Sequence, residues 1–179
     1  MDNEERLIGR ARTGDGQALS GLAEQYAPQV YRLAFCLLKS EEEARDAAGD
    51  VFVKLYESPE KIPVQGFKPW LMKVVYNHCL DLLRRRKTWQ GLLPRLLRYS
   101  QAGLEPDPAQ AAADAEEQII VRQALLKLPE KERAALVLRY YQDLSYDEIS
   151  EVLGVAASLV GTWLHRGKAR MKEILEQKG

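Results

Sequence analysis

Long apolar runs and cysteines are scarce in this sequence. No stretch approaches the ~20 consecutive apolar residues that a membrane-spanning helix needs, and the N-terminal MDNEERLIGR has no apolar signal core. The two cysteines, Cys36 and Cys79, are far apart, and each falls inside an apolar helical pattern, so neither a disulfide framework nor a CxxC metal clip is indicated. We expect a cytoplasmic protein with two buried thiols and no direct membrane insertion.

Residue constellations typical of enzymes and of cofactor sites are also absent from the sequence. It contains no phosphate-binding loop, no nucleophile and base constellation and no paired-carboxylate site. Its two histidines, His78 and His165, do not stand at ligand spacing from a cysteine or carboxylate cluster. We therefore expect that the protein is not an enzyme and that it has no catalytic residue, metal, cofactor or small-molecule substrate.

The chain lacks a net charge, but the sum hides how the charges are distributed. Residues 1–57 carry eleven acids and seven bases, whereas residues 61–101 carry nine bases and the single acid Asp81. Residues 102–151 again favour acids, eleven against five, and residues 152–179 carry five bases and two acids. Two basic stretches that alternate with two acidic ones are the pattern expected of two separate DNA footprints.

Strict alternation of apolar and polar residues is scarce as well, and apolar residues recur instead at the three- and four-residue spacing of helices. Ser40 and Glu43 form a capping box that predicts the start of a helix ending near Ser58-Pro59, after which residues 58–66 form a loop. Pro69 suits the first turn of the next helix, which is predicted to run to Arg86. The sequence therefore predicts an all-α protein.

Periodicity fades between residues 87 and 113, where glycines and prolines accumulate, so this stretch is predicted to be a flexible linker. Helices resume near Asp114 and break at Leu128-Pro129, which predicts four helices in the remainder of the chain. We expect two small helical domains, covering residues 1–87 and 114–179, joined by a linker of residues 88–113.

The segment LSYDEISEVLG and the residues after it have the pattern of a helix-turn-helix. Ser145 and Glu148 form a second capping box, and Gly154 stands where a helix C-terminus favours the left-handed conformation. A long basic helix follows, and this geometry lays a recognition helix in the major groove of DNA. A helical hairpin with a solvated charged face is the alternative that geometry leaves open, and the scarcity of acid between residues 152 and 170 favours DNA.

Three segments resemble the extracytoplasmic-function, or group IV, sigma factors of bacteria. LPEKERAALVLRYYQDLSYDEISEVLGV resembles region 4 of that family, FKPWLMKVVYNHCLDLLRRRK resembles regions 2.3 and 2.4, and ARDAAGDVFVKLY resembles region 2.2. The resemblance implies a sigma factor that binds core RNA polymerase, recognises and melts promoter DNA, and starts transcription of a specific regulon.

The resemblance also implies three groups of contact residues. The family docks its region 2.2 helix on a coiled coil of the polymerase largest subunit. It reads the minus-ten element with the helix of regions 2.3 and 2.4. The loop before the helix of regions 2.3 and 2.4, here residues 58–66, accepts a flipped base whose unstacking costs a few kcal/mol. The family reads the minus-35 element with the recognition helix. The implied residues are Asp46, Asp50, Phe52, Lys54 and Leu55 for core polymerase; Lys73, Asn77, Asp81, Arg84 and Arg85 for minus-ten DNA; and Ser158, Thr162, Trp163, Arg166 and Lys168 for minus-35 DNA.

Structural alternatives stand beside two of these assignments. Phe52 and Leu55 are also suited to the domain core alone. The basic run of residues 84–87 would also suit a helix C-terminus, where the helix dipole favours cations.

Three residues depart from the pattern of the family. Gly49 replaces a usual glutamine, and a mid-helix glycine costs about 1 kcal/mol relative to alanine while removing a side-chain contact. Gly161 and Trp163 replace residues that are usually basic, and an indole cannot imitate a bidentate arginine at guanine. Two rival hypotheses therefore stay open: a stand-alone helix-turn-helix regulator that acts without polymerase, favoured by Gly49, and a sigma-like interaction protein that has lost promoter recognition, favoured by Gly161 and Trp163.

The resemblance implies one further partner. Members of the family are commonly held inactive by an anti-sigma factor, in some cases anchored in the membrane, that clamps between the two domains. By the same resemblance the linker threads into the polymerase, and its apolar residues, Trp89 and several leucines, also suit a second partner.

Overall fold

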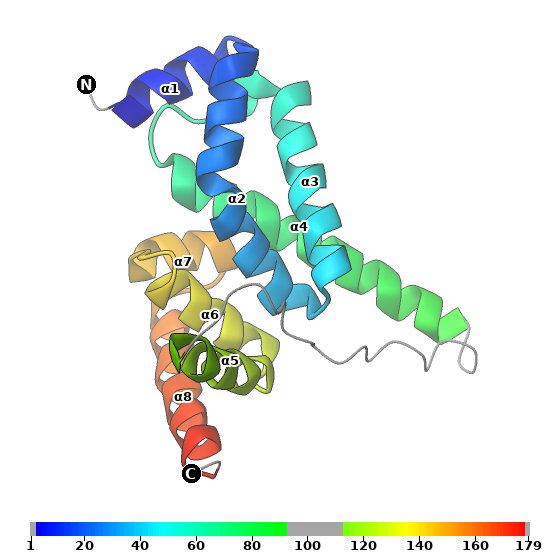
Figure 1. Cartoon of the computed structure of the whole chain (residues 1–179), viewed down its shortest axis with the longest axis vertical. Coiled ribbons are helices and arrows are strands. Elements are labelled where there is room, and N and C mark those ends of the chain that lie inside the picture. The colour runs from blue at the N-terminus through cyan, green and yellow to red at the C-terminus, as the bar shows by residue number, and fades with distance from the viewer. Residues whose placement is uncertain (1–2, 93–112, 178–179) are drawn as a thin grey trace.

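The computed structural model describes residues 3–92 and 113–177, and these residues form helices with no strand among them (Figure 1). The expected all-α class is therefore confirmed. None of the helices in these two ranges is both long and apolar enough to cross a bilayer. In chain order the elements are α1 (Asn3–Arg12), α2 (Gly16–Leu38), α3 (Glu41–Glu57), the 3-10 turn η1 (Pro59–Lys61), α4 (Phe67–Leu92), α5 (Ala113–Leu126), α6 (Glu130–Tyr140), α7 (Tyr146–Leu153) and α8 (Ala157–Glu176).

Short-range hydrogen bonds define the helix ends that the sequence predicts. The Ser40 hydroxyl accepts from the Glu43 backbone N–H at 3.3 Å and begins α3. At the start of α7 the capping box is reciprocal: Ser145 accepts from the Glu148 N–H at 3.2 Å, and the Glu148 carboxylate accepts from the Ser145 N–H at 2.7 Å. Gly154 ends α7 with φ of 67°, in the left-handed region. The predicted helix ends are confirmed, but only half of the predicted Ser40/Glu43 capping box is present, because the Glu43 carboxylate pairs with Arg86 of α4.

The helix α4 is longer than the sequence predicts. It continues past Arg86 to Leu92, so the first residues of the expected linker are helical. Arg, Lys and Gln are good helix formers, and the first strong helix breaker after Arg86 is Pro94, which also disfavours the helical conformation of the residue before it. The rest of the expected linker, residues 93–112, lies outside the described residues.

The core of the N-terminal half is built on α2, which packs against α1, α3 and α4 (Figure 1). Tyr26 of α2 meets Phe67 of α4 edge to face, with ring centroids 5.1 Å apart. Cys36 and Cys79 are both free and buried in this core, as expected from their apolar surroundings in the sequence. Burial raises the pKa of the Cys36 thiol to about 11 and that of Cys79 to about 12, so both stay protonated at neutral pH.

In the C-terminal half, α8 crosses α6 at a glycine. A Cβ atom on Gly167 would lie 3.0 Å from Cδ1 and 3.2 Å from Cγ of Leu136, so only glycine permits this close approach without a shift. Ile149 of α7 and Val160 and Leu164 of α8 complete the core beside this crossing. The buried side of α8 is therefore held by its packing against α6 and α7.

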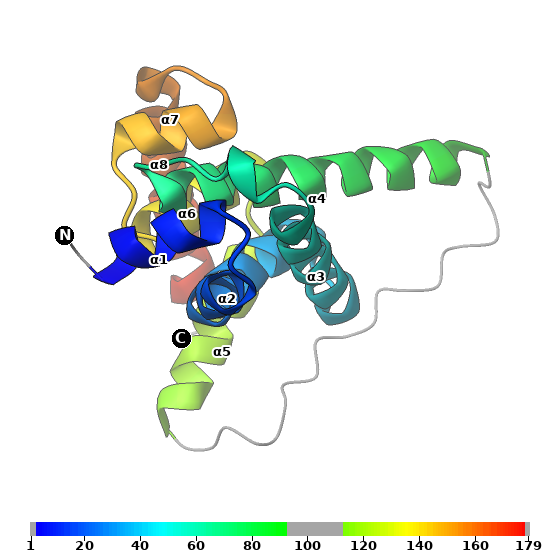
Figure 2. The same cartoon turned by 90° about the horizontal axis from the view of Figure 1, so that it is seen from above.

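The two halves pack against each other in this structure, with α6 against α2 and α7 against α4 (Figures 1 and 2). Arg133 of α6 is only 3% exposed, and its guanidinium donates to the backbone carbonyls of Cys36 and Leu128. The guanidinium of Arg122 lies 4.0 Å from the centroid of the Phe35 ring. Buried, hydrogen-bonded arginine links the end of α2 to the start of α6.

Candidate functional site

The outward face of α3 carries most of the residues expected to bind polymerase. Asp46, Asp50 and Lys54 recur every four residues along one side of the helix, and all three are exposed. Phe52 is half-buried and packs against the core, and Leu55 is 4% exposed and belongs to that core. The packing alternative is therefore favoured for Leu55, whereas the three charged side chains face solvent.

Two exposed residues of the same face were not anticipated from the sequence. Val53 is 54% exposed, and Glu57 lies one helical turn beyond it. Both continue the stripe of Asp46, Asp50 and Lys54, and helical spacing from these residues was the signal that would have found them. We call Asp46, Asp50, Val53, Lys54 and Glu57 the α3 stripe.

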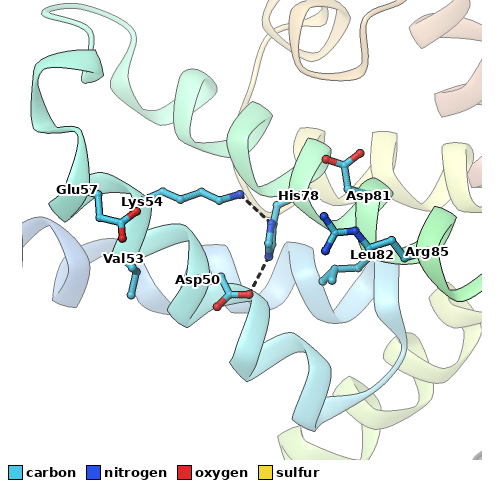
Figure 3. Close-up of a pocket in the computed structure, with 8 residues that line it drawn as sticks. All are labelled: Asp50, Val53, Lys54, Glu57, His78, Asp81, Leu82 and Arg85. Carbon is cyan, nitrogen blue, oxygen red and sulfur yellow. Dashed lines mark hydrogen bonds and ion pairs between the residues drawn. The ribbon is translucent and has the colours of Figure 1, made fainter.

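A histidine of α4 bridges two charged residues of the α3 stripe (Figure 3). The Lys54 ammonium nitrogen lies 2.9 Å from Nδ1 of His78, and Asp50 Oδ2 lies 3.2 Å from Nε2 of the same ring. Since an ammonium can only donate, Nδ1 accepts and carries no proton, and Nε2–H then donates to the carboxylate. The bonding thus selects the neutral Nε2–H tautomer, with its ring between the two charges.

These residues line a hollow of about 330 Å³ between α3 and α4 (Figure 3). Glu57, Asp81 and Arg85 add further charges to its wall. Pockets for small molecules are lined mainly by apolar and aromatic side chains, and the charged lining of this hollow does not resemble them. No group of three or more His, Cys, Asp and Glu side chains in the described ranges could hold a metal ion.

The outward face of α4 presents the residues expected at the minus-ten element. Lys73, Asn77 and Arg85 are exposed, while Trp70, Val74 and Leu82 pack against the core as predicted. Asp81 and Arg84 are exposed too, but they pair with each other across 3.2 Å. Asp81 therefore orients an arginine of its own helix.

The basic run at residues 84–87 divides between two uses. The Arg86 guanidinium pairs with the Glu43 carboxylate of α3, which links the two helices. Arg84, Arg85 and Lys87 are exposed. The run therefore serves both helix packing and a cationic surface.

The loop of residues 58–66 before α4 contains η1 and is fixed by one buried side chain. Ile62 is 1% exposed and lies in the core, whereas Val64 is 61% exposed at the loop surface. Gly66 has φ of 68° and precedes the first residue of α4. The loop thus has a defined base and an exposed apolar tip near the α4 surface.

The recognition helix α8 exposes four of the five residues expected at the minus-35 element: Ser158, Thr162, Arg166 and Lys168. Leu159 at the N-terminal end is also exposed, at 38%, and was not anticipated. Trp163 is half-buried, and the Lys131 ammonium of α6 lies 5.4 Å from its ring centroid. One face of the indole is therefore occupied by a cation of the same domain.

Aromatic and basic residues of α6 and α7 border the recognition helix. The Lys168 ammonium lies 5.3 Å from the Tyr140 ring centroid, and a hydrogen bond with Tyr140 raises the pKa of Lys168, which therefore stays charged. The Arg139 guanidinium lies 5.6 Å from the Tyr146 ring centroid. A Cβ on Gly161 would approach Tyr146 Cε2 only to 3.7 Å, an ordinary van der Waals contact. Exposed Tyr140 and Tyr146 therefore add amphipathic contact area to the helix-turn-helix.

The two glycines at positions that depart from the family pattern have room for side chains. A Cβ on Gly49 meets nothing within 4 Å, and the residue is exposed on α3 beside Asp50. Gly161 is limited only by the ordinary contact with Tyr146. Neither glycine is required by close packing, so both lie at surfaces open to substitution.

Comparison with known proteins matches both halves of the chain. The family described as Sigma-70 region 2 matches residues 22–88, and the family described as Sigma-70, region 4 matches residues 118–171. The ECF RNA polymerase sigma factor SigW of Bacillus subtilis (strain 168) is 29% identical over 180 residues, covering 95% of each chain. The ECF RNA polymerase sigma factor SigM of Mycobacterium tuberculosis (strain ATCC 25618 / H37Rv) is 30% identical over 176 residues, covering 97% of this chain and 85% of SigM.

A solved structure shares the fold. The sigma factor RpoE of Bartonella quintana, in complex with the anti-sigma factor NepR, superposes with a TM-score of 0.73. The superposition covers 87% of this chain and 97% of RpoE at 18% sequence identity.

Proposed function

This chain belongs to the extracytoplasmic-function sigma factors of the sigma-70 family, and on that premise we propose how its surfaces serve transcription initiation. The α3 stripe binds core RNA polymerase, the outward face of α4 reads and opens the minus-ten element, and α8 reads the minus-35 element. The observation that carries the proposal is that each expected region presents its polar residues to solvent.

The co-occurrence of region 2 and region 4 supports this proposal over the stand-alone regulator. A stand-alone regulator needs only the helix-turn-helix, yet residues 22–88 match region 2 as well. The outward face of α3 is accessible to a partner, since Asp46, Asp50 and Lys54 are exposed. Gly49 leaves open space beside Asp50, and we expect the polymerase contact there to be weakened but not lost.

At the minus-ten element we assign the duplex and single-strand contacts to different residues. Lys73, Arg84 and Arg85 contact phosphates, because they are exposed cations on one helix. Asn77 has an amide that donates and accepts, which suits a base edge in the opened strand. The loop of residues 58–66 accepts the flipped base, and contacts between that base and the loop offset the few kcal/mol that unstacking costs.

At the minus-35 element the N-terminal half of α8 faces base edges and the following turns meet phosphates. Ser158 and Thr162 are short, exposed hydroxyl residues suited to base contacts, and Trp163 adds an apolar edge. Arg166 and Lys168 are the phosphate contacts. The protein makes and breaks no covalent bond in this role, so we propose that it is not an enzyme and that it acts in the cytoplasm on polymerase and promoter DNA.

We also propose that an anti-sigma factor binds this chain and keeps it from polymerase. The shared fold with RpoE, which was solved in complex with the anti-sigma factor NepR, supports this proposal. An anti-sigma factor that covers the α3 stripe would compete directly with core polymerase.

The experiment that tests the function combines a binding assay with transcription in vitro. The full chain is mixed with core RNA polymerase, and the complex is then offered a genomic DNA template. Complex formation and initiation from defined start sites are expected. Absence of any complex would favour the stand-alone regulator, and a complex that starts transcription nowhere would favour the interaction protein. A test variant, Lys54→Glu, reverses one charge of the α3 stripe and should weaken the complex.

A further inference from the structure

Asp50 and Lys54 of the α3 stripe each contact His78 and do not pair with each other. Asp50 and Lys54 are four residues apart on one helix, with the acid on the N-terminal side, and this is the favoured orientation for a helical ion pair. Within the described residues no ion pair joins them; each binds the His78 ring instead. One imidazole therefore keeps the two charges apart.

Both charges remain available to a partner in this arrangement. His78 uses only Oδ2 of Asp50, and the Asp50 side chain is 59% exposed. The Lys54 ammonium has three donors and gives one of them to His78. The His78 side chain itself is 13% exposed, so the ring lies beneath the two charged side chains and is itself little accessible to a partner.

We propose that His78 is a positioning residue that stops Asp50 and Lys54 from pairing with each other and presents both charges to core RNA polymerase. This inference rests on the proposed role of the α3 stripe. A self-paired Asp50 and Lys54 would have to separate before either could bind a partner group. The neutral imidazole prevents the pair because it accepts from one residue and donates to the other.

The nature of this contact predicts which replacements succeed. Glutamine carries a carbonyl acceptor and an N–H donor on one side chain, so His78→Gln can accept from Lys54 and donate to Asp50. Leucine fills comparable space without either bond. His78→Leu is therefore expected to weaken binding to core polymerase about twofold, the strength of one exposed helical ion pair that must first separate, while His78→Gln keeps the wild-type affinity.

The test measures core polymerase affinity for the full chain and both variants, and repeats His78→Leu in an Asp50→Asn/Lys54→Met background. If His78 acts by positioning, His78→Leu costs nothing further in that background, because no pair remains to prevent. An equal loss in both backgrounds, wild-type affinity of His78→Leu, or equal weakness of His78→Gln and His78→Leu would overturn the inference. A wild-type chain that binds no core polymerase would instead refute the proposed function.

A measurement without any change at His78 provides a second test. The chain has two histidines, so a His165→Gln variant leaves a single imidazole whose nitrogen resonances report the tautomer. The Nε2–H tautomer is expected near neutral pH. A dominant Nδ1–H tautomer could not accept from Lys54 and would overturn the inference even if His78→Leu failed to fold.

Discussion

Two glycines of the recognition helix predict opposite effects for the same substitution. Gly161→Ala adds a methyl group whose nearest neighbour, Tyr146 Cε2, is 3.7 Å away. Alanine in a helix interior is favoured over glycine by about 1 kcal/mol, and no clash opposes that gain. The variant is expected to raise the free energy of unfolding by about 0.5–1 kcal/mol.

Gly167→Ala adds the same methyl group where α8 crosses α6. Its Cβ would lie 3.0 Å and 3.2 Å from two carbons of Leu136, and 3.5 Å from Cβ of Glu132. Leu136 is buried, at 6% exposed, and overpacking against such a side chain costs about 1–3 kcal/mol. After the helix-propensity gain, a net loss of about 1 kcal/mol remains.

The two variants should therefore differ by about 2 kcal/mol in urea-induced unfolding followed by circular dichroism. For a chain of this length each kcal/mol also corresponds to about 2–4 °C in Tm. Equal stabilisation by both substitutions would refute the close approach of α6 and α8. The helix-turn-helix geometry would then need another account of how α8 is held.

Three further predictions concern the binding surfaces. Arg166→Ala should weaken duplex binding and lower the slope of log affinity against log salt by about one unit, because one phosphate contact is lost. Lys172→Ala, near the C-terminal end of α8, removes the same charge and serves as the control. A slope unchanged by Arg166→Ala would contradict the phosphate role. Asn77→Ala should slow promoter opening, measured by permanganate reactivity of unpaired thymines, while duplex affinity stays the same; a parallel loss of duplex affinity would argue against a single-strand role. Gly49→Gln should strengthen binding to core polymerase, since a side chain there meets open space beside the α3 stripe. Gly49→Ala should increase only the stability of the helix. Equal affinities of the two variants for core polymerase would show that this position does not contact polymerase.

Helix ends were predictable because the residues that fix them are neighbours in sequence. Ser40 begins α3, the reciprocal bonds of Ser145 and Glu148 begin α7, and Gly154 ends it. Each depends on a hydrogen bond or a backbone angle within a few residues. The end of α4 was placed too early because helix formers follow Arg86 and the next proline is Pro94.

The assignment of side chains to surfaces was less predictable, because it depends on what each helix packs against. Helical periodicity groups Leu55 with the buried residues of α3, while the family resemblance had also suggested it as a partner contact. The buried position of Arg133 and its bonds to the end of α2 involve residues far apart in sequence. The sequence indicated only that His78 is not at metal-ligand spacing, and the packing of α3 on α4 shows that it bridges Asp50 and Lys54.

Some of the bases counted in the basic stretch of residues 61–101 are already paired with acids in the structure. Among the bases of residues 61–101, Arg86 pairs with Glu43, and Arg84 pairs with Asp81 but stays exposed. A base that already has an acid partner loses that interaction if it turns to a phosphate, so we expect Lys73, Arg85 and Lys87, the exposed cations of α4 with no acid partner among the described residues, to dominate the salt dependence at the minus-ten element. We therefore expect fewer phosphate contacts at the minus-ten element than the basic stretch of the sequence suggests, because some of its cations already pair with an acid on α3 or α4.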